Sequence, residues 1–312
     1  MTSPRRSDEL TVHVGPTSPE EILGAIRRSG ARLGSLEEAD AVVWMTSSTK
    51  GFPRSLPSRV SWIQLPAAGI EEWFRDDIID PSREWTSATG AYSLNVAEHA
   101  LALLLVGVRS IGPCIAEPGW RRAEMFERAT TLNGARVAII GAGGIGATLI
   151  PAFTALGCHS LAVTRRGLPV PGAEQTFPAD GLHAALAAAD HAVVAAPATA
   201  ATRHLIGRRE LGLLKPTSWI VNVARGSLID SEALCAALRA GTLGGAALDV
   251  TDPEPLPPDH PLWQAPNVII TPHIANTPQA LIRDFAERVE VNLRRRLKNQ
   301  PLLGRVDTEA GY

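Results

Sequence analysis

The chain has 312 residues, which at roughly 150 residues per domain is enough for two domains. Its content of 45% hydrophobic, 20% charged and 5% aromatic residues excludes disordered, collagen-like and disulfide-scaffold proteins. Thirty basic residues against 32 acidic ones give a net charge of -2, so no overall field favours nucleic acid or an anionic membrane as partner. The partner must therefore be inferred from local motifs.

Cysteine content and apolar runs bear on the compartment. Cys114, Cys158 and Cys235 are too few and too scattered for a disulfide framework or a zinc site, which predicts buried structural thiols in a reducing compartment and no metal. The first ten residues lack an apolar signal-peptide core, and the longest apolar run, residues 100–108, is far shorter than the ~20 residues that span a bilayer. We therefore expect a cytoplasmic protein without a membrane segment.

The first ninety or so residues predict short strands that alternate with helices, which is typical of an open parallel sheet. The expected elements are a strand at Leu10–Val14, a helix at Pro19–Ser29, a strand at Ala41–Met45 and an apolar stretch at Trp62–Leu65. A long buried helix is predicted at Asn95–Arg109, because this stretch is rich in helix formers and has no glycine before position 107. This helix should join two domains.

A second series of strands and helices predicts a doubly wound parallel sheet with helices on both faces. Its expected strands are Arg136–Ile140, Ser160–Val163, His191–Ala195, Trp219–Asn222, Gly245–Val250 and Val268–Thr271. Its expected helices run from the first strand to about Leu156, at Leu182–Ala188 and at Ser231–Ala240, and a final helix covers about Pro278–Lys298. We expect two Rossmann-like α/β domains with a cleft between them, one formed by residues 1–94 and 286–312 and the other by residues 95–285.

A glycine-rich loop follows the first strand of this series. The pattern G-x-G-x-x-G is formed by Gly141, Gly143 and Gly146. In a Rossmann fold the first glycine makes the turn, the second lets the backbone approach a pyrophosphate, and the third permits close packing of helix on strand. Free N–H groups at the start of the helix, at Gly144 and Ile145, can then bind phosphates. The alternative is a glycine-rich turn without a ligand.

The cofactor type is indicated about 20 residues beyond the loop, where NAD sites usually carry an acidic residue. This chain has Thr164, Arg165 and Arg166 there. A hydroxyl and two guanidinium groups suit the 2′-phosphate of NADP, because arginine offers bidentate charge-assisted hydrogen bonds. We predict NADP(H) as the preferred cofactor and NAD(H) as a possible one; alternatively, both arginines are simply solvated. Pro151 is expected to kink or shorten the helix after the loop.

Three later segments at predicted strand ends carry Arg225, Glu254 and His273, and carboxyl ends of parallel strands share the edge that holds the glycine loop. Reduction of a 2-keto acid needs a cation to hold the carboxylate and polarise the carbonyl, which Arg225 can supply. It also needs a proton donor, for which His273 is the natural candidate, with Glu254 favouring the imidazolium and orienting the ring. The alternatives are an Arg225 paired with Asp230, a solvated Glu254 and a structural His273.

Four segments together resemble the D-isomer-specific 2-hydroxyacid dehydrogenase family, particularly its short glyoxylate/hydroxypyruvate reductase-like members. These segments are residues 141–146, 221–230, 249–254 and 271–275. The predicted helix at 95–109 and the segments at 131–134 and 189–197 extend the resemblance over most of the chain. Asn276 departs from the family pattern, which commonly has glycine there.

The resemblance implies roles for particular residues. It assigns substrate binding and polarisation to Arg225, acid/base catalysis to His273 and support of that histidine to Glu254. It also implies a homodimer around the helix at 95–109, within which His99 is interpreted as structural.

The resemblance also implies contacts with the substrate and the cofactor. Backbone N–H groups that would bind the substrate carboxylate across the cleft are those of Ala67, Ala68 and Gly69. Asp249 would face the nicotinamide carboxamide, while Pro197 and Ala224 would line the cofactor.

We therefore expect an NAD(P)-dependent oxidoreductase that reduces a small 2-keto acid such as glyoxylate or hydroxypyruvate to the D-2-hydroxy acid. One alternative is an NAD(H)-sensing interaction protein with the same fold, similar to the corepressor-type relatives of the family. Another is an NAD-dependent oxidation like that of phosphoglycerate dehydrogenase.

Overall fold

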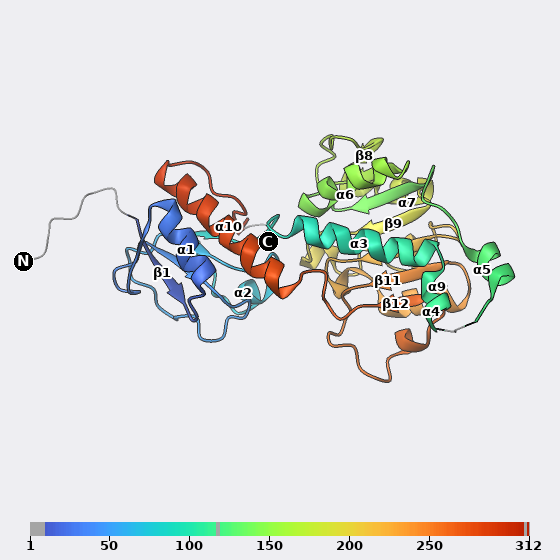
Figure 1. The fold of residues 1–312 in the computed structure, drawn as a ribbon, viewed down its shortest axis with the longest axis horizontal. Helices are drawn as coiled ribbons and strands as arrows, with labels where there is room; N and C mark the ends of the chain where they lie inside the picture. The colour runs from blue at the N-terminus through green and yellow to red at the C-terminus, as the bar shows by residue number, and fades with distance from the viewer. Residues whose placement is uncertain (1–9, 117–118, 309–310, 312) are drawn as a thin grey trace, which may run out of the picture. The chain divides into compact units, whose positions relative to one another are not determined.

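The computed structural model describes residues 10–116, 119–308 and 311. The chain divides into two compact units, which the colours of Figure 1 separate: unit 1 holds the residues up to Tyr92 and those from Thr277 onward, and unit 2 is Ser93–Asn276. Each unit contains one sheet, and every paired strand in both sheets is parallel, which confirms the predicted fold class.

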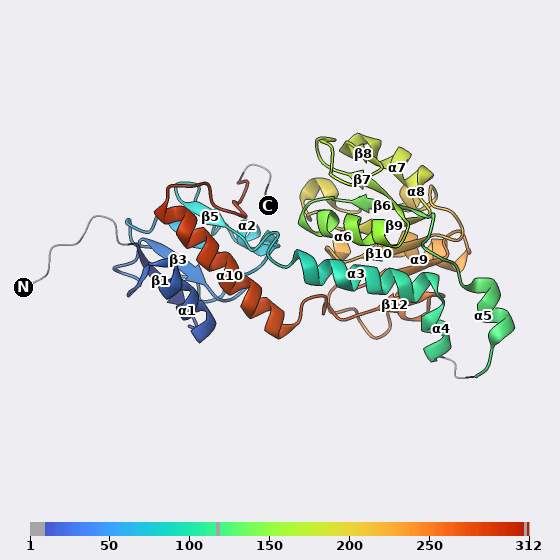
Figure 2. The same ribbon diagram turned by 45° about the horizontal axis from the view of Figure 1, so that its top comes forward.

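The second boundary differs from the predicted one. Position 286 lies inside helix α10 (Pro278–Leu297), whereas unit 1 resumes at Thr277, the N-cap of that helix. The reason is packing, because α10 lies beside α1 (Glu20–Ser29) in unit 1 (Figures 1 and 2).

The sheet of unit 1 has the strand order β2-β1-β3-β4-β5. Its strands are β1 (Thr11–Gly15), β2 (Arg32–Leu33), β3 (Ala41–Trp44), β4 (Trp62–Gln64) and β5 (Glu84–Thr86). Helix α2 (Glu71–Arg75) follows β4. The sequence did not predict β2, β5 or α2, because elements of two to five residues are too short to show a periodic pattern.

Aromatic rings form much of the core of unit 1. Phe52 meets Trp44 and Trp73 edge-on, each at a ring-centroid distance of 5.0 Å, and lies 5.8 Å from Trp85. All four side chains are buried. Edge-to-face packing of this kind stabilises a core beyond the effect of area alone.

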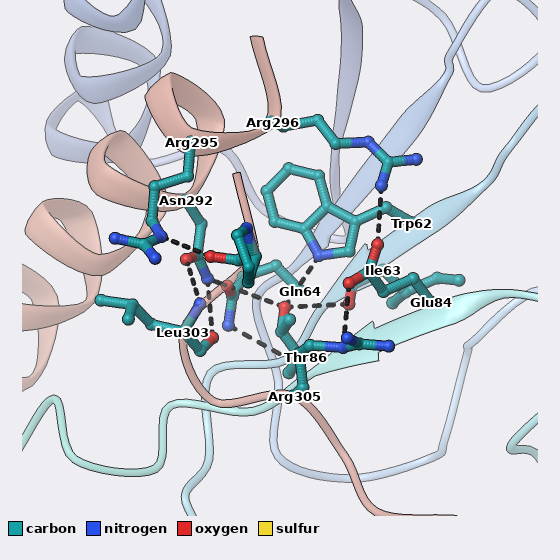
Figure 3. Close-up of polar contacts among 11 residues, drawn as sticks. Trp62, Ile63, Gln64, Glu84, Thr86, Asn292, Arg295, Arg296, Leu303 and Arg305 are labelled. Carbon is teal, nitrogen blue, oxygen red and sulfur yellow. Dashed lines mark hydrogen bonds and ion pairs between the residues drawn. The ribbon is translucent and has the colours of Figure 1, made fainter. Parts of the chain in front are cut away.

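A buried polar network joins β4, β5, α10 and the C-terminal segment of unit 1 (Figure 3). Gln64 Oε1 accepts hydrogen bonds from Thr86 Oγ1 at 2.9 Å and from Asn292 Nδ2 at 2.8 Å, and all three side chains are fully buried. The Asn292 amide also pairs with the Leu303 main chain, through Nδ2 to the carbonyl at 3.0 Å and Oδ1 to the N–H at 2.8 Å. These bonds attach α10 and the C-terminal segment to the end of β4.

The sheet of unit 2 has seven strands in the order β12-β11-β10-β9-β6-β7-β8. The strands are β6 (Arg136–Ile140), β7 (His159–Val163), β8 (Gln175–Phe177), β9 (His191–Val194), β10 (Trp219–Asn222), β11 (Gly245–Leu248) and β12 (Val268–Ile270). Six of them agree with the predicted strands to within two residues, because strands buried on both faces are almost continuously apolar.

Helices cover both faces of this sheet (Figures 1 and 2). One face packs on α3 (Ser93–Val108) and α6 (Gly144–Ala155), and the other on α7 (Leu182–Ala188), α8 (Arg208–Leu211) and α9 (Ser231–Arg239). Pro151 does not end α6, which continues to Ala155.

Two short helices, α4 (Ile111–Ala116) and α5 (Arg122–Arg128), follow α3 and were not predicted. Cys158 and Cys235 are buried as expected, whereas the expectation is wrong for Cys114, which is exposed in α4. The part of the chain that the structure describes contains no helix that is both long enough and apolar enough to cross a membrane.

Replacement of Asn292 by leucine tests the polar network. Asn292→Leu keeps the approximate side-chain size but leaves the Leu303 main chain without its partner and Gln64 Oε1 with one donor fewer. We expect the free energy of unfolding in urea to fall by about 2–4 kcal/mol. Gln300→Ala, at an exposed amide close by, should change it by less than about 0.5 kcal/mol. Equal stability of both variants would contradict a structural role for the network.

Candidate active site

A row of paired residues crosses the sheet of unit 2 where its strands end. From β7 to β12 the row consists of Val163, Ile140, Val194, Asn222, Leu248 and Ile270. Each is the last residue of its strand. Because the strands are parallel and end in register, the segments that follow them all begin at one edge of the sheet, where ligands bind in open α/β sheets.

The glycine loop requires its first and last glycines for packing. Gly141 has a φ of +91°, and a Cβ there would lie 2.4 Å from the Ala196 backbone in the segment after β9. A Cβ on Gly146 would approach Ile139 Cγ2 to 3.0 Å, so this glycine lets α6 lie close to β6. The N–H groups of Gly141 and Ala142 donate to the Val163 carbonyl at 2.9 and 3.1 Å, which ties the loop to the end of β7.

The middle glycine faces open space. A Cβ on Gly143 would meet nothing within 4 Å, although Gly143 is the N-cap of α6. The N–H groups of Gly144 and Ile145 belong to the first turn of α6. They therefore have no acceptor within the helix, and they lie at its positive end. This arrangement fits the pyrophosphate of a dinucleotide, as the sequence pattern predicts.

The predicted 2′-phosphate segment starts directly after Val163. Thr164 Oγ1 accepts a hydrogen bond from the Gly167 N–H at 3.0 Å, which turns the chain and keeps the segment compact. The side chains of Arg165 and Arg166 are exposed. Since Val163 also holds the glycine loop, two cationic side chains follow the strand end that anchors the predicted pyrophosphate site.

Arg225 is presented by a turn that Asn222 closes at the end of β10. Asn222 Nδ2 donates to the Arg225 carbonyl at 2.8 Å, and its Oδ1 accepts from the Ala224 N–H at 3.0 Å. The Arg225 guanidinium donates from Nη1 to the Ala224 carbonyl at 2.7 Å. The Asp230 carboxylate, considered as an alternative partner for this arginine, accepts two N–H groups of the first turn of α9 and serves as the N-cap of that helix.

His273 and Glu254 form a close pair. The distance from His273 Nδ1 to Glu254 Oε1 is 2.6 Å, and the two side chains are 49% and 42% exposed. A carboxylate only accepts hydrogen bonds, so Nδ1 carries the hydrogen and Nε2 is the second ring nitrogen available for proton exchange. His273 has a left-handed φ of +54°, which is uncommon for a residue with a side chain and occurs preferentially at functional sites.

The Asp249 carboxylate supports the segment that carries His273. Its Oδ1 accepts from Thr271 Oγ1 at 2.6 Å and from the Ile274 N–H at 2.9 Å, and its Oδ2 accepts from the Ala275 N–H at 3.0 Å. The side chain is 1% exposed. Asp249, which was expected to face the nicotinamide, thus accepts its hydrogen bonds from donors of the protein itself.

Pro197 and Ala224, the other residues expected to line the cofactor, follow β9 and β10 at the same edge. Ala224 is buried, whereas Pro197 is exposed and its carbonyl accepts from Thr202 Oγ1 at 2.8 Å. Asn95 Nδ2 also donates to Asn276 Oδ1 near this edge, at 3.1 Å, a contact that the sequence did not predict.

In unit 1, the loop after β4 holds three successive carbonyls in hydrogen bonds. The carbonyls of Pro66, Ala67 and Ala68 accept from the Tyr92 phenol at 2.5 Å, the Ala88 N–H at 2.8 Å and the Thr89 hydroxyl at 3.2 Å. Among the described residues, no acceptor contacts the N–H groups of residues 67–69. Burial raises the pKa of Tyr92, so its phenol remains a donor. No sequence pattern indicated Tyr92, because its partner is set by folding alone.

Two glycine variants separate packing from ligand binding. Gly143→Ala should preserve Tm, because its methyl group enters open space, and weaken dinucleotide binding about 10-fold or more by occupying the approach to the backbone. Gly141→Ala should lower Tm, because the methyl group would clash with Ala196 at a positive φ. Thermal unfolding and fluorescence titration measure the two effects. Full dinucleotide affinity in Gly143→Ala would contradict the assignment of the pyrophosphate site.

Comparison with known proteins gives a consistent result. The family model described as D-isomer specific 2-hydroxyacid dehydrogenase, NAD binding domain, matches residues 101–275. An uncharacterized protein in the proB 3′ region of Corynebacterium melassecola is 36% identical over 283 residues, which cover 90% of this chain and 92% of that protein. A glyoxylate reductase of Korarchaeum cryptofilum is 31% identical over 216 residues, 67% of this chain and 64% of that enzyme.

Solved structures extend the similarity to the whole fold. The D-isomer specific 2-hydroxyacid dehydrogenase of Xanthobacter autotrophicus Py2, in complex with NADPH and MES, has a TM-score of 0.83 and 26% identity, covering 98% of this chain and 100% of that one. A family protein from Aeromonas salmonicida has a TM-score of 0.76 and 27% identity, covering 96% and 99%. The chain, with its glycine loop and three strand-end segments, therefore belongs to the D-isomer specific 2-hydroxyacid dehydrogenase family of NAD(P)-dependent oxidoreductases.

Proposed function

We propose that this protein reduces a small 2-keto acid of the glyoxylate or hydroxypyruvate type to the D-2-hydroxy acid, with NADPH as the preferred hydride donor. The observation that carries the proposal is the 2.6 Å hydrogen bond between His273 Nδ1 and Glu254 Oε1, formed at the sheet edge that also holds the glycine loop and Arg225. The glyoxylate reductases among the relatives support the substrate class.

His273 supplies the proton in this proposal. Glu254 holds Nδ1–H and so leaves Nε2 to donate a proton to the oxygen that becomes an alkoxide during reduction. Because the ring is half exposed, it can regain its proton from solvent between turnovers.

Arg225 binds and polarises the substrate. Its guanidinium donates from Nη1 to the Ala224 carbonyl, which restrains the cation before the substrate arrives. A planar guanidinium can hold a carboxylate through two parallel hydrogen bonds and draw electron density from the neighbouring carbonyl. The N–H groups of Ala67, Ala68 and Gly69 in unit 1 are proposed as carboxylate donors, as the sequence resemblance implied, since the carbonyls of residues 66–68 are hydrogen-bonded to other groups.

The residues of unit 2 fit a bound dinucleotide, which supplies the hydride. The loop at 141–146 would hold its pyrophosphate, and Pro197 and Ala224 would line it at the sheet edge. Thr164, Arg165 and Arg166 would bind a 2′-phosphate, which is the reason for preferring NADP(H) over NAD(H). The NADPH complex of the Xanthobacter relative supports this preference.

A second copy of the chain is proposed to pack around α3, as the sequence resemblance implied. Large apolar side chains are exposed at the start of α3 and along the two helices that follow it: Leu94, Ile111, Ile115 and Phe126. An accumulation of such side chains is typical of an interaction surface.

Replacement of His273 by asparagine tests the proton donor. His273→Asn removes the titratable ring but keeps the left-handed backbone, which asparagine tolerates. We expect kcat to fall by ~10²- to 10⁴-fold while the affinity for NADPH changes little. Steady-state kinetics over a panel of 2-keto acids and fluorescence titration of the cofactor measure the two quantities.

The same experiment separates the alternatives. If the parent oxidises neither NADPH nor NADH with any keto acid of the panel, the proposed reduction is wrong and NAD(H) sensing is favoured. An active parent with an equally active His273→Asn variant would mean that another group supplies the proton.

Reversal of charge at Arg165 tests the cofactor preference. Arg165→Asp removes a cation from the proposed 2′-phosphate site and adds a carboxylate that can accept ribose hydroxyls. The ratio of kcat/KM for NADPH to that for NADH should fall about 10-fold or more. Arg239→Asp, at the last turn of α9 and hence at the opposite edge of the sheet, is the control for net charge. A parent that already prefers NADH would refute the assignment.

A further inference from the structure

His99 lies in α3 and has no role in the proposed function. Its ring contacts Thr271 and Asp249, which support the segment that carries His273. His99 Nε2 is 3.0 Å from Thr271 Oγ1 and 3.2 Å from Asp249 Oδ1. The His99 side chain is 20% exposed, and that of Asp249 is 1% exposed. The helix thus contributes one polar group to the buried cluster at the carboxyl ends of β11 and β12.

The hydrogen-bond directions in this cluster follow from its geometry. Asp249 can only accept, so the Thr271 hydroxyl hydrogen points to Asp249 Oδ1, 2.6 Å away. Thr271 Oγ1 can then only accept from His99. Nε2 therefore faces two acceptors and must carry a hydrogen. His99 acts as a donor that holds the hydroxyl and the carboxylate in place together.

The cluster controls the backbone on both sides of His273. Asp249 accepts the N–H groups of the two residues that follow His273, and Thr271 stands two residues before it. The His273 N–H itself donates to the carbonyl oxygens of Asp249, at 2.8 Å, and Thr271, at 3.0 Å. Such anchoring offsets the unfavourable left-handed conformation of His273, which directs its ring to Glu254.

We propose that His99 is a positioning residue for His273, acting through Thr271 and Asp249. The inference rests on the proposed function, in which His273 donates the proton. Without the Nε2–H donor, Asp249 keeps three of its donors but Thr271 loses its link to α3, so the segment 271–275 becomes less constrained. The His273 ring would then hold its place beside Glu254 less well, and displacement of a reacting group by about 1 Å can cost ~100-fold in rate.

Two amide replacements separate hydrogen bonding from packing. The side-chain amide of glutamine reaches about as far as Nε2 of histidine, whereas that of asparagine reaches only about as far as Nδ1. His99→Asn should lower kcat roughly 10- to 100-fold without weakening NADPH binding. His99→Gln should recover most of that loss, because its amide nitrogen can donate to Thr271. His183→Asn, which removes a comparable 2.8 Å contact between His183 and Glu210 in α7 and α8, serves as the control.

A spectroscopic measurement tests positioning without turnover. The chain contains eight histidines, so the ring signals of His273 in 15N-histidine-labelled protein can be assigned from the His273→Asn spectrum. In the parent, the ring nitrogen shifts should report hydrogen at Nδ1, held there by Glu254. In His99→Asn these shifts should move toward tautomer averaging, and in His99→Gln they should stay close to those of the parent.

The outcomes are distinct. Parent-like kcat and parent-like His273 shifts in His99→Asn would overturn the inference, as would equal damage in the asparagine and glutamine variants, which would show that His99 only fills space. A parent that reduces no keto acid would refute the proposed function. In that case the nitrogen shifts alone decide whether His99 positions His273.

Discussion

Hydrogen-bonded register across the sheet of unit 2 is the constraint on which the candidate site depends. Six parallel strands end on one row that runs from Val163 to Ile270, so the residue after each strand starts at the same edge. The segments that carry the candidate residues therefore all begin at this edge, because the hydrogen bonds between the strands align the strand ends. A slip of one residue in any strand would move its segment along the strand axis and turn its side chains to the opposite face.

Close backbone contacts at this edge explain where glycine is required. A Cβ on Gly226 would lie 1.9 Å from the Thr251 carbonyl carbon, and one on Gly141 would lie 2.4 Å from Ala196. Neighbouring segments at this edge therefore touch through their main chains. The costs of this arrangement, a left-handed His273 and a buried Asp249 carboxylate, are offset by multiple hydrogen bonds.

In unit 1, buried hydrogen bonds likewise hold the end of a strand from which an exposed loop begins. Gln64, at the end of β4, is held by Thr86 from the neighbouring strand and by Asn292 from α10. The chain then enters the loop at 66–69, whose carbonyls are bound by a segment about twenty residues further on. The hydrogen bonds that the loop carbonyls accept therefore also orient the N–H groups of the loop.

The sequence alone determined the parallel α/β class, most strands of unit 2, the glycine loop and the candidacy of Arg225, Glu254 and His273. These are local properties: buried strands read as apolar runs, and functional residues follow strand ends at short spacing. Tertiary structure decided the rest. His99 meets Thr271 across 172 positions and Asn292 meets Gln64 across 228, and no local pattern encodes such partners. Tertiary structure also decided that Asp249 accepts a hydrogen bond from the segment after His273 and that α10 belongs to unit 1 from Thr277 onward. Both depend on packing between distant elements.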